Sequence, residues 1–230
     1  MNINKYKWWI IGGLTLTAIS ITTAIIIGQR RKLNGKSSAN KLKNPNPKKV
    51  LIVGDSFSVD VKGAYARIVK DALKERGIET DILSKSGAET SWMLDNLKNQ
   101  LLTNKYDRIY FYGGINDSFA LRKVEDILAR VQKIVDVGNE NGADVFVVKG
   151  YLIDNMCTQE NLKPTKYVTT KEAFIPLVQR FREYRAKLNE DNIKNAHWVQ
   201  QFDLQGNTSD GTHPNGTGYK MIADAILKTI

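Results

Sequence analysis

Two kinds of hydrophobic pattern alternate from residue 50 to the end of the chain. Short runs rich in β-branched and aromatic residues predict five strands, at 50–53, 79–83, 108–112, 144–149 and 197–202. Longer segments with apolar residues at helical spacing predict five helices, at 61–76, 91–103, 124–141, 171–192 and 216–228. Each predicted strand is followed by a predicted helix.

This strict alternation of strands and helices is typical of a parallel sheet covered on both faces. We therefore expect an α/β fold, a three-layer α/β/α sandwich of the flavodoxin-like kind, with a five-stranded parallel sheet in the order 2-1-3-4-5. In such sheets ligands bind beyond the carboxyl ends of the strands. The segments that directly follow strands are the places to look for chemistry.

The chain before residue 50 has a different composition. Residues 8–28 form an uncharged 21-residue run, WWIIGGLTLTAISITTAIIIG, which is long enough to cross a bilayer as a helix. A cleavable signal peptide is the alternative, but this run is long for one and no Ala-x-Ala-like cleavage site follows it. We expect a single-pass membrane anchor after a short tail at 1–7. Suitable interfacial residues flank it, namely Trp8, Trp9, Arg30, Arg31 and Lys32.

Residues 29–48 are rich in Lys, Asn, Ser and Pro, and this composition predicts a basic, flexible linker. The folded domain is expected at 49–230. Ten of the 34 Lys and Arg residues precede residue 50, whereas none of the 24 Asp and Glu residues does. The net charge of +10 is therefore carried by the N-terminal segment, and the domain is formally neutral. We expect a membrane partner for the basic segment and no nucleic-acid partner for the domain.

The supply of metal-binding side chains is small. The chain has one cysteine, Cys157, which cannot form an intrachain disulfide, and two histidines, His197 and His213. A Cys-rich metal site is impossible, and a His-rich one is not expected. His197 falls on a predicted strand, where we expect a structural role, and Cys157 is expected to take no part in chemistry.

A serine follows the first predicted strand, in the segment Gly54-Asp55-Ser56-Phe57-Ser58. A hydroxyl there lies at the ligand-binding edge, close to amide groups that favour developing negative charge. The alternative is that Ser56 or Ser58 simply caps a helix. The segment is neither a Gly-x-Ser-x-Gly nucleophile elbow nor a phosphate-binding loop.

Two further segments carry polar groups at the same edge. After the third strand, Gly113 and Gly114 allow close backbone approach, and Asn116 offers an amide donor for an oxyanion. An Asn-Asp turn is the alternative for this segment. Near the C-terminus, Asp210 precedes His213 by three residues, so its carboxylate can orient the imidazole toward a nucleophile. A turn with an incidental surface histidine is the alternative there.

Together these segments resemble the SGNH hydrolases, also called the GDSL family, over residues 49–230. Gly54-Asp55-Ser56 matches the first block of that family, Gly114-Ile115-Asn116-Asp117 the third, and Asp210-Gly211-Thr212-His213-Pro214 the fifth. Ser86-Gly87-Ala88 is similar to the second block, though it is the weakest match. The resemblance implies a catalytic triad of Ser56, His213 and Asp210, and an oxyanion hole of Ser56, Gly87 and Asn116. It also implies no metal and no organic cofactor.

The expected activity is that of a membrane-anchored serine esterase on a small-molecule, glycan or lipid ester. Two alternatives remain open: an O-acyltransferase that acts on a glycan with the same triad, and a catalytically silent, tethered glycan-binding module. Residues 150–170 lack periodicity and are expected to border the substrate. The excess of positive charge after the anchor favours a cytoplasmic domain. The glycan substrates of anchored relatives favour an extracytoplasmic one, which we expect.

Overall fold

The computed structural model describes residues 41–150, 170–199, 204, 206–209 and 212–230. Residues Asn40–Ile230 form one compact unit. The predicted anchor at 8–28, the linker up to residue 40, Asp210, and residues 151–169 with Cys157 lie outside the described residues. No helix within the described ranges combines the length and the apolar character that a membrane crossing requires.

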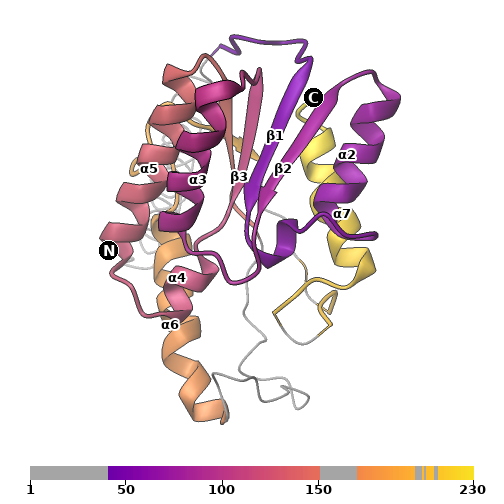
Figure 1. Cartoon of the computed structure of the whole chain (residues 1–230). Coiled ribbons are helices and arrows are strands. Elements are labelled where there is room, and N and C mark those ends of the chain that lie inside the picture. The colour runs from indigo at the N-terminus through magenta and orange to yellow at the C-terminus, as the bar shows by residue number, and fades with distance from the viewer. Residues whose placement is uncertain (1–40, 151–169, 200–203, 205, 210–211) are drawn as a thin grey trace, which may run out of the picture. The chain divides into compact units, whose positions relative to one another are not determined.

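A five-stranded sheet lies at the centre of this unit (Figure 1). All neighbouring strands are parallel, and their order is β2-β1-β3-β4-β5, which confirms the predicted topology. The strands are β1 (Lys49–Gly54), β2 (Glu79–Ser84), β3 (Arg108–Tyr112), β4 (Asp144–Val148) and β5 (His197–Val199). Residues 200–202 of the predicted fifth strand lie outside the described residues.

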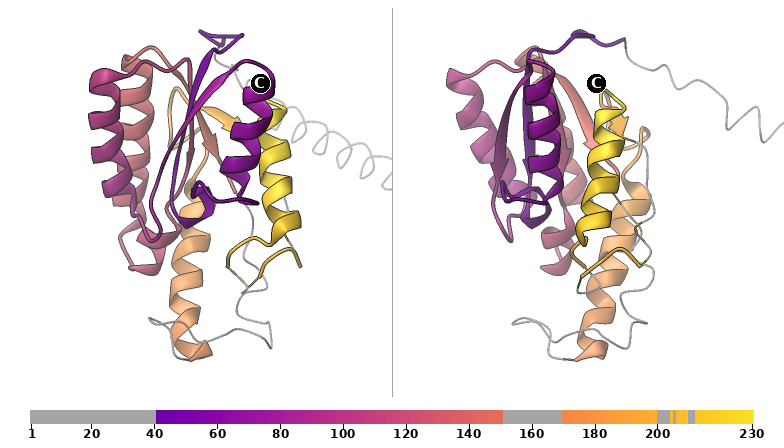
Figure 2. Two further views of the ribbon diagram at one scale, coloured as in Figure 1. Left: turned by 45° about the vertical axis from the view of Figure 1, so that its right-hand side comes forward. Right: turned by 90° about the vertical axis from the view of Figure 1, so that its right-hand side faces the viewer.

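Two layers of helices cover the sheet, as Figure 2 shows in its left view. On one face α2 packs against α7, and on the other α3 packs against α5, which in turn contacts α6. This arrangement buries every residue of β3 and β4, and explains why those strands are nearly continuous hydrophobic runs. The helices are η2 (Ser56–Ser58, a 3-10 turn), α2 (Tyr65–Glu75), α3 (Thr90–Thr103), α4 (Ile115–Phe119), α5 (Val124–Glu140), α6 (Lys171–Lys187) and α7 (Gly216–Leu227).

Three local differences from the sequence prediction have physical causes. The helix predicted at 61–76 begins at Tyr65, because Ala64 N–H closes a tight turn onto the Val61 carbonyl at 3.0 Å. The helix predicted at 171–192 ends at Lys187, where the Asn189 side chain accepts from the next backbone N–H groups and forms a separate turn. The short helix α4 has no counterpart among the predicted helices, because five residues are too few to show a helical period.

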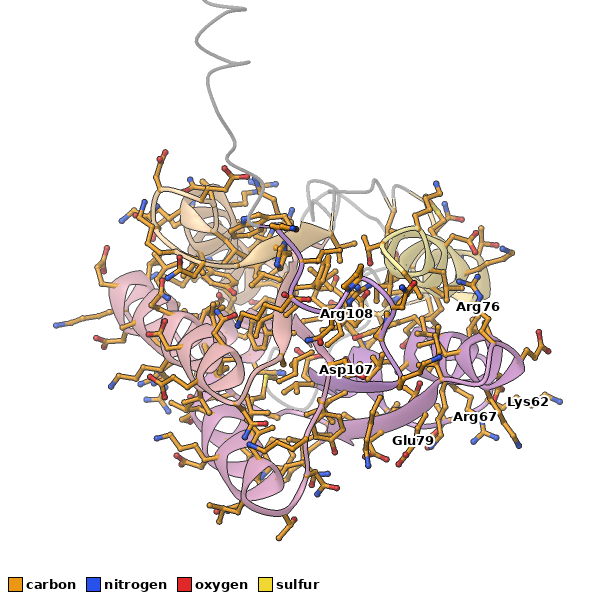
Figure 3. All side chains as sticks on the ribbon, turned by 90° about the horizontal axis from the view of Figure 1, so that it is seen from above. Lys62, Arg67, Arg76, Glu79, Asp107 and Arg108 are labelled. Atoms are coloured by element: carbon orange, nitrogen blue, oxygen red, sulfur yellow. The ribbon has the colours of Figure 1, made fainter. Side chains whose placement is uncertain are left out.

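The amino-terminal edge of the sheet holds the chain where it enters the domain. The Asp144 carboxylate accepts hydrogen bonds from Lys43 N–H at 3.0 Å and Asn44 N–H at 2.8 Å. Arg108 is fully buried and donates to the carbonyls of Asn44 at 2.9 Å and Thr229 at 2.6 Å. Figure 3 looks onto this edge and shows Arg108 near its centre. Residues 43 and 44 are thus bonded to the domain.

His197 belongs to the same edge. Its Nε2 lies 3.5 Å from an Asp144 carboxylate oxygen, and its ring stacks on Phe146 with 4.8 Å between centroids. Burial lowers its pKa, and the nearby Asp144 carboxylate partly opposes that shift. Because it stands at the edge opposite to the strands' carboxyl ends, its contacts concern the packing of β4 and β5.

The packing of α5 on the sheet leaves no room beside Gly138. A Cβ at this position would lie 2.5 Å from Val145 Cγ2 and 3.1 Å from Ile109 Cδ1. We predict that Gly138→Ala lowers the free energy of unfolding by about 1–3 kcal/mol, because overpacking displaces a branched core side chain. Urea denaturation measures this change. Gly216→Ala is the matched control, since a Cβ there meets nothing within 4 Å; equal stability of the two variants would contradict the prediction.

Candidate active site

Ser56 opens the 3-10 turn η2, immediately beyond the carboxyl end of β1. The turn is capped by Asp55, whose carboxylate accepts from Phe57 N–H at 3.0 Å, while Ser58 N–H donates to the Asp55 carbonyl at 3.0 Å. Ser58 Oγ is hydrogen-bonded to the buried hydroxyl of Tyr65 at 2.6 Å. Neither Ser56 nor Ser58 caps a helix, since the cap of η2 is Asp55 and α2 has no side-chain cap. The half-buried Ser56 is therefore held in a rigid turn.

His213 reaches this serine from the far end of the chain. The Ser56 Oγ and His213 Nε2 atoms are 3.1 Å apart, although the two residues are separated by 157 positions. The His213 and Phe57 rings form a T-shaped contact, with 5.2 Å between centroids and 86° between the ring planes. Ser209 N–H donates to the His213 carbonyl at 2.8 Å and tightens the turn before α7. The structure thus brings together the predicted nucleophile and the predicted base.

Asn116 lies in the first turn of α4, one strand over from Ser56. Its side-chain amide donates to the Ala88 carbonyl at 3.0 Å. The chain enters α4 through Gly114 at φ 100°, where a Cβ would lie 2.5 Å from the Tyr184 ring. Tyr184 also donates its hydroxyl to the Gly113 carbonyl at 3.1 Å. Only glycine fits this sharp, closely packed entry.

Gly87 lies in the loop after β2, on the other side of β1. It occupies the third position of a four-residue turn closed by Ala88 N–H and the Lys85 carbonyl at 3.0 Å. Its φ of 74° is left-handed, as the third position of a type II turn requires. Lys85 N–H approaches the Gly54 carbonyl at 3.4 Å, which places the turn beside the end of β1. Ala88, the next residue, is the partner of the Asn116 amide.

Four of the five predicted site residues therefore lie in the segments that follow β1, β2 and β3 and in the turn before α7. Ser56 contacts His213 directly, and Gly87 neighbours the residue that binds Asn116. Asp210, the predicted partner of His213, lies outside the described residues. Among the residues that the structure describes, no cluster of three or more His, Cys, Asp or Glu side chains could hold a metal ion.

The sequence interpretation gives Asp55 no role, yet its carboxyl is buried in the residue next to Ser56, the predicted nucleophile. Burial raises the pKa of this carboxyl to about 7, against the opposing effects of the Phe57 N–H bond and the charge of nearby His213. Its position between Gly54 and Ser56, at the end of a buried strand, is the signal that could have drawn attention to it.

Comparison with known proteins identifies the family. A model of the GDSL-like lipase/acylhydrolase family matches residues 52–221. The chain belongs to this family. It is accordingly an ester-hydrolysing enzyme, and the matched range includes Ser56, Gly87, Asn116 and His213. No curated protein sequence matches this GDSL-like acylhydrolase.

Solved structures share the fold of this GDSL-like acylhydrolase at low sequence identity. The psychrotrophic esterase EstA from a Pseudoalteromonas species, in a structure inhibited by monoethylphosphonate, is 18% identical, with a TM-score of 0.55 over 79% of this chain and 96% of that chain. The acetyl xylan esterase AlAXEase is 16% identical, with a TM-score of 0.54 over 79% and 99%. A lipase/acylhydrolase from Enterococcus faecalis is also 16% identical, with a TM-score of 0.54 over 79% and 94%.

The raised pKa of Asp55 predicts a pH-dependent stability. The unfolded chain ionises this carboxyl near its ordinary pKa of 3.8 and the folded protein near 7. The contribution of Asp55 to the free energy of unfolding therefore falls as the pH rises from about 4 to about 7, and is constant above that. Asp55→Asn removes this titration and keeps an oxygen to accept from Phe57 N–H.

We predict that Asp55→Asn gains stability relative to wild type by a few kcal/mol, as an order of magnitude, between about pH 4 and pH 8. The measurement is urea denaturation of both proteins at several pH values. If the difference in the free energy of unfolding between the two proteins does not change with pH, it reflects the buried amide alone and contradicts the prediction.

Proposed function

We propose that this acylhydrolase cleaves carboxylic esters with Ser56 as nucleophile, His213 as general base and Asp210 as the partner of His213. The observation that carries the proposal is the 3.1 Å approach of Ser56 Oγ to His213 Nε2. A serine hydroxyl is a weak nucleophile until a neighbouring base accepts its proton. His213 precedes α7 and Ser56 follows β1, so the fold holds these two distant residues in direct contact.

In the proposed reaction His213 Nε2 takes the Ser56 proton as Oγ attacks the ester carbonyl. The resulting imidazolium is stabilised by Asp210 and then protonates the departing alcohol as the C–O bond breaks. Water attacks the acyl-enzyme as His213 accepts its proton. Collapse of the second tetrahedral intermediate then breaks the bond between the acyl carbon and Ser56 Oγ, His213 returns the proton to Oγ, and the carboxylic acid leaves. The edge contact with Phe57 supports the orientation of the imidazole throughout.

In this proposal three hydrogen-bond donors stabilise the negative charge on the tetrahedral oxygen. They are Ser56 N–H, Gly87 N–H and the Asn116 side chain. An amide group carries two N–H donors. One of those of Asn116 binds the Ala88 carbonyl, which fixes the orientation of the amide and leaves the second N–H for the oxyanion. Loss of a donor of this kind typically raises the barrier by about 3 kcal/mol.

We predict that Ser56→Ala abolishes ester hydrolysis while the protein stays folded. A fluorophosphonate probe is expected to label the wild type at a single site and to leave Ser56→Ala unlabelled, because the probe requires an activated serine. Ser91→Ala, an exposed serine on α3, is the matched control and is expected to be labelled normally. Full esterase activity in Ser56→Ala would refute the assignment of the nucleophile.

The substrate proposed is an acylated glycan or a lipid ester, in keeping with the acetyl xylan esterase and the lipase/acylhydrolase that share the fold. The sequence predicts two alternatives. The acyltransferase differs from a hydrolase in the acceptor of the acyl group, and the silent module differs in forming no acyl-enzyme. An O-acyltransferase passes the acyl group to a sugar hydroxyl, so product analysis with and without a glycan acceptor separates it from a hydrolase. The silent binding module disagrees with the ester-hydrolysing family to which the chain belongs; such a module would form no acyl-enzyme and would not be labelled by the probe.

We further propose that residues 8–28 anchor the protein in a membrane, with the domain on the extracytoplasmic side. The uncharged run and the basic residues after it support the anchor. The extracytoplasmic side is proposed from the glycan substrate alone. We predict that removal of residues 1–28 transfers the esterase activity from the membrane fraction to the soluble fraction. Protease treatment of intact cells tests sidedness: a protected domain would favour the cytoplasmic orientation that the positive-inside count indicates.

A further inference from the structure

A second buried carboxylate, that of Asp117, lies behind the candidate oxyanion donors. Asp117 is fully buried, and its oxygens accept from Thr90 N–H at 2.8 Å, from the Thr90 hydroxyl at 2.6 Å and from Arg130 Nη1 at 3.3 Å. Burial raises the pKa of this carboxyl, and the two bonds from Thr90 oppose that shift. The proposed chemistry of Ser56 and His213 does not use this group.

The contact with Thr90 stabilises the start of α3 from outside that helix. The N-cap residue of α3, Glu89, makes no side-chain cap bond. A helix begins with N–H groups that lack intrahelical partners, and these favour a negative charge. Asp117 supplies both the acceptor and the charge from α4, which lies near the lower end of α3 in Figure 1.

The same two elements meet at a second point. Asn116, the residue before Asp117, donates to the Ala88 carbonyl at 3.0 Å. Adjacent residues of α4 thus bind the loop after β2 at Ala88 and the first residue of α3 at Thr90. Gly87 is joined covalently to Ala88, so these bonds fix the position of its N–H relative to the Asn116 amide.

We propose that Asp117 is a positioning residue that, through Thr90, sets the spacing between the two oxyanion donors Gly87 N–H and Asn116. The inference rests on the proposed function of those donors. Donors stabilise an oxyanion only at hydrogen-bond distance from the place where the charge develops. A shift of about 1 Å in such a group can lower the rate by two orders of magnitude. Asp117 itself does not touch the substrate.

An ion pair at the surface provides an internal comparison. Arg122 binds Glu89 through Nε at 3.0 Å and Nη2 at 3.1 Å, and so bridges the same loop to the residues that follow α4. The Arg122 side chain is half exposed, so solvent screens this ion pair, whereas the carboxylate of Asp117 is fully buried. We therefore expect loss of the Arg122–Glu89 ion pair to affect kcat less than loss of the buried hydrogen bond between Thr90 and Asp117.

The experiment removes one donor to Asp117 and measures hydrolysis of a soluble short-chain ester by the full chain. Thr90→Val deletes the hydroxyl and keeps the N–H bond; we expect kcat to fall about ten-fold with KM within about two-fold of wild type. Thr90→Ser restores the hydroxyl and is expected to restore kcat. Glu89→Gln, the matched surface control, is expected to stay within about two-fold of wild type. If Thr90→Val does not fold, Thr90→Ala removes the same hydroxyl.

A double-mutant cycle separates positioning from a general loss of structure. In an Asn116→Ala background one of the two donors is already absent, so Thr90→Val is expected to lower kcat by less than about three-fold. An equal fold-loss in both backgrounds, or a Thr90→Ser variant as impaired as Thr90→Val, would overturn the proposal, as would a Thr90→Val variant with wild-type kcat.

Failure of this proposal is distinguishable from failure of the proposed function. An active Ser56→Ala variant removes the basis for both. An inactive Ser56→Ala variant together with an unaffected Thr90→Val variant leaves the serine mechanism in place and rejects the role of Asp117 alone.

Discussion

The shared register of β1 with its two neighbours is the constraint on which the candidate site depends. Gly54, the last residue of β1, pairs with Ser84 of β2 and Tyr112 of β3. Because parallel strands in register end at the same level, the three loops that follow them begin side by side. A slip of β2 or β3 by one residue would reverse the side-chain faces of that strand and move its loop away from Ser56.

Two buried carboxyls lie within this framework: Asp55 directly follows β1, and Asp117 lies in α4, after the neighbouring strand β3. Burial of a charged carboxylate is unfavourable unless hydrogen bonds and nearby charges offset it. Each of these groups accepts from backbone N–H, of Phe57 in one case and of Thr90 in the other. In both cases the bond orders the backbone around a residue of the site. The domain thus combines an apolar sheet with a few polar contacts at the points where loop geometry must be fixed.

Local patterns are sufficient to predict the sheet, its strand order and the helices that cover it, because a buried parallel sheet leaves a strong hydrophobic signal in each strand. The pairing of Ser56 with His213 then follows from topology, since both residues lie at the same edge of the sheet. The bond between Asp117 and Thr90 could not be predicted in this way, because no periodicity or spacing connects residues 27 positions apart. The remaining residue of the predicted triad, Asp210, lies outside the described residues and stays a prediction.

The described chain enters and leaves the domain at one edge of the sheet. Asp144 holds Lys43 there, and Arg108 joins Asn44 to Thr229, next to the C-terminal Ile230. Ser56 is at the opposite edge, at the far end of β1. Immobilising this protein on a solid support through Ile230 would therefore leave the edge that carries Ser56 facing the solution, where bulky polymeric esters can approach it.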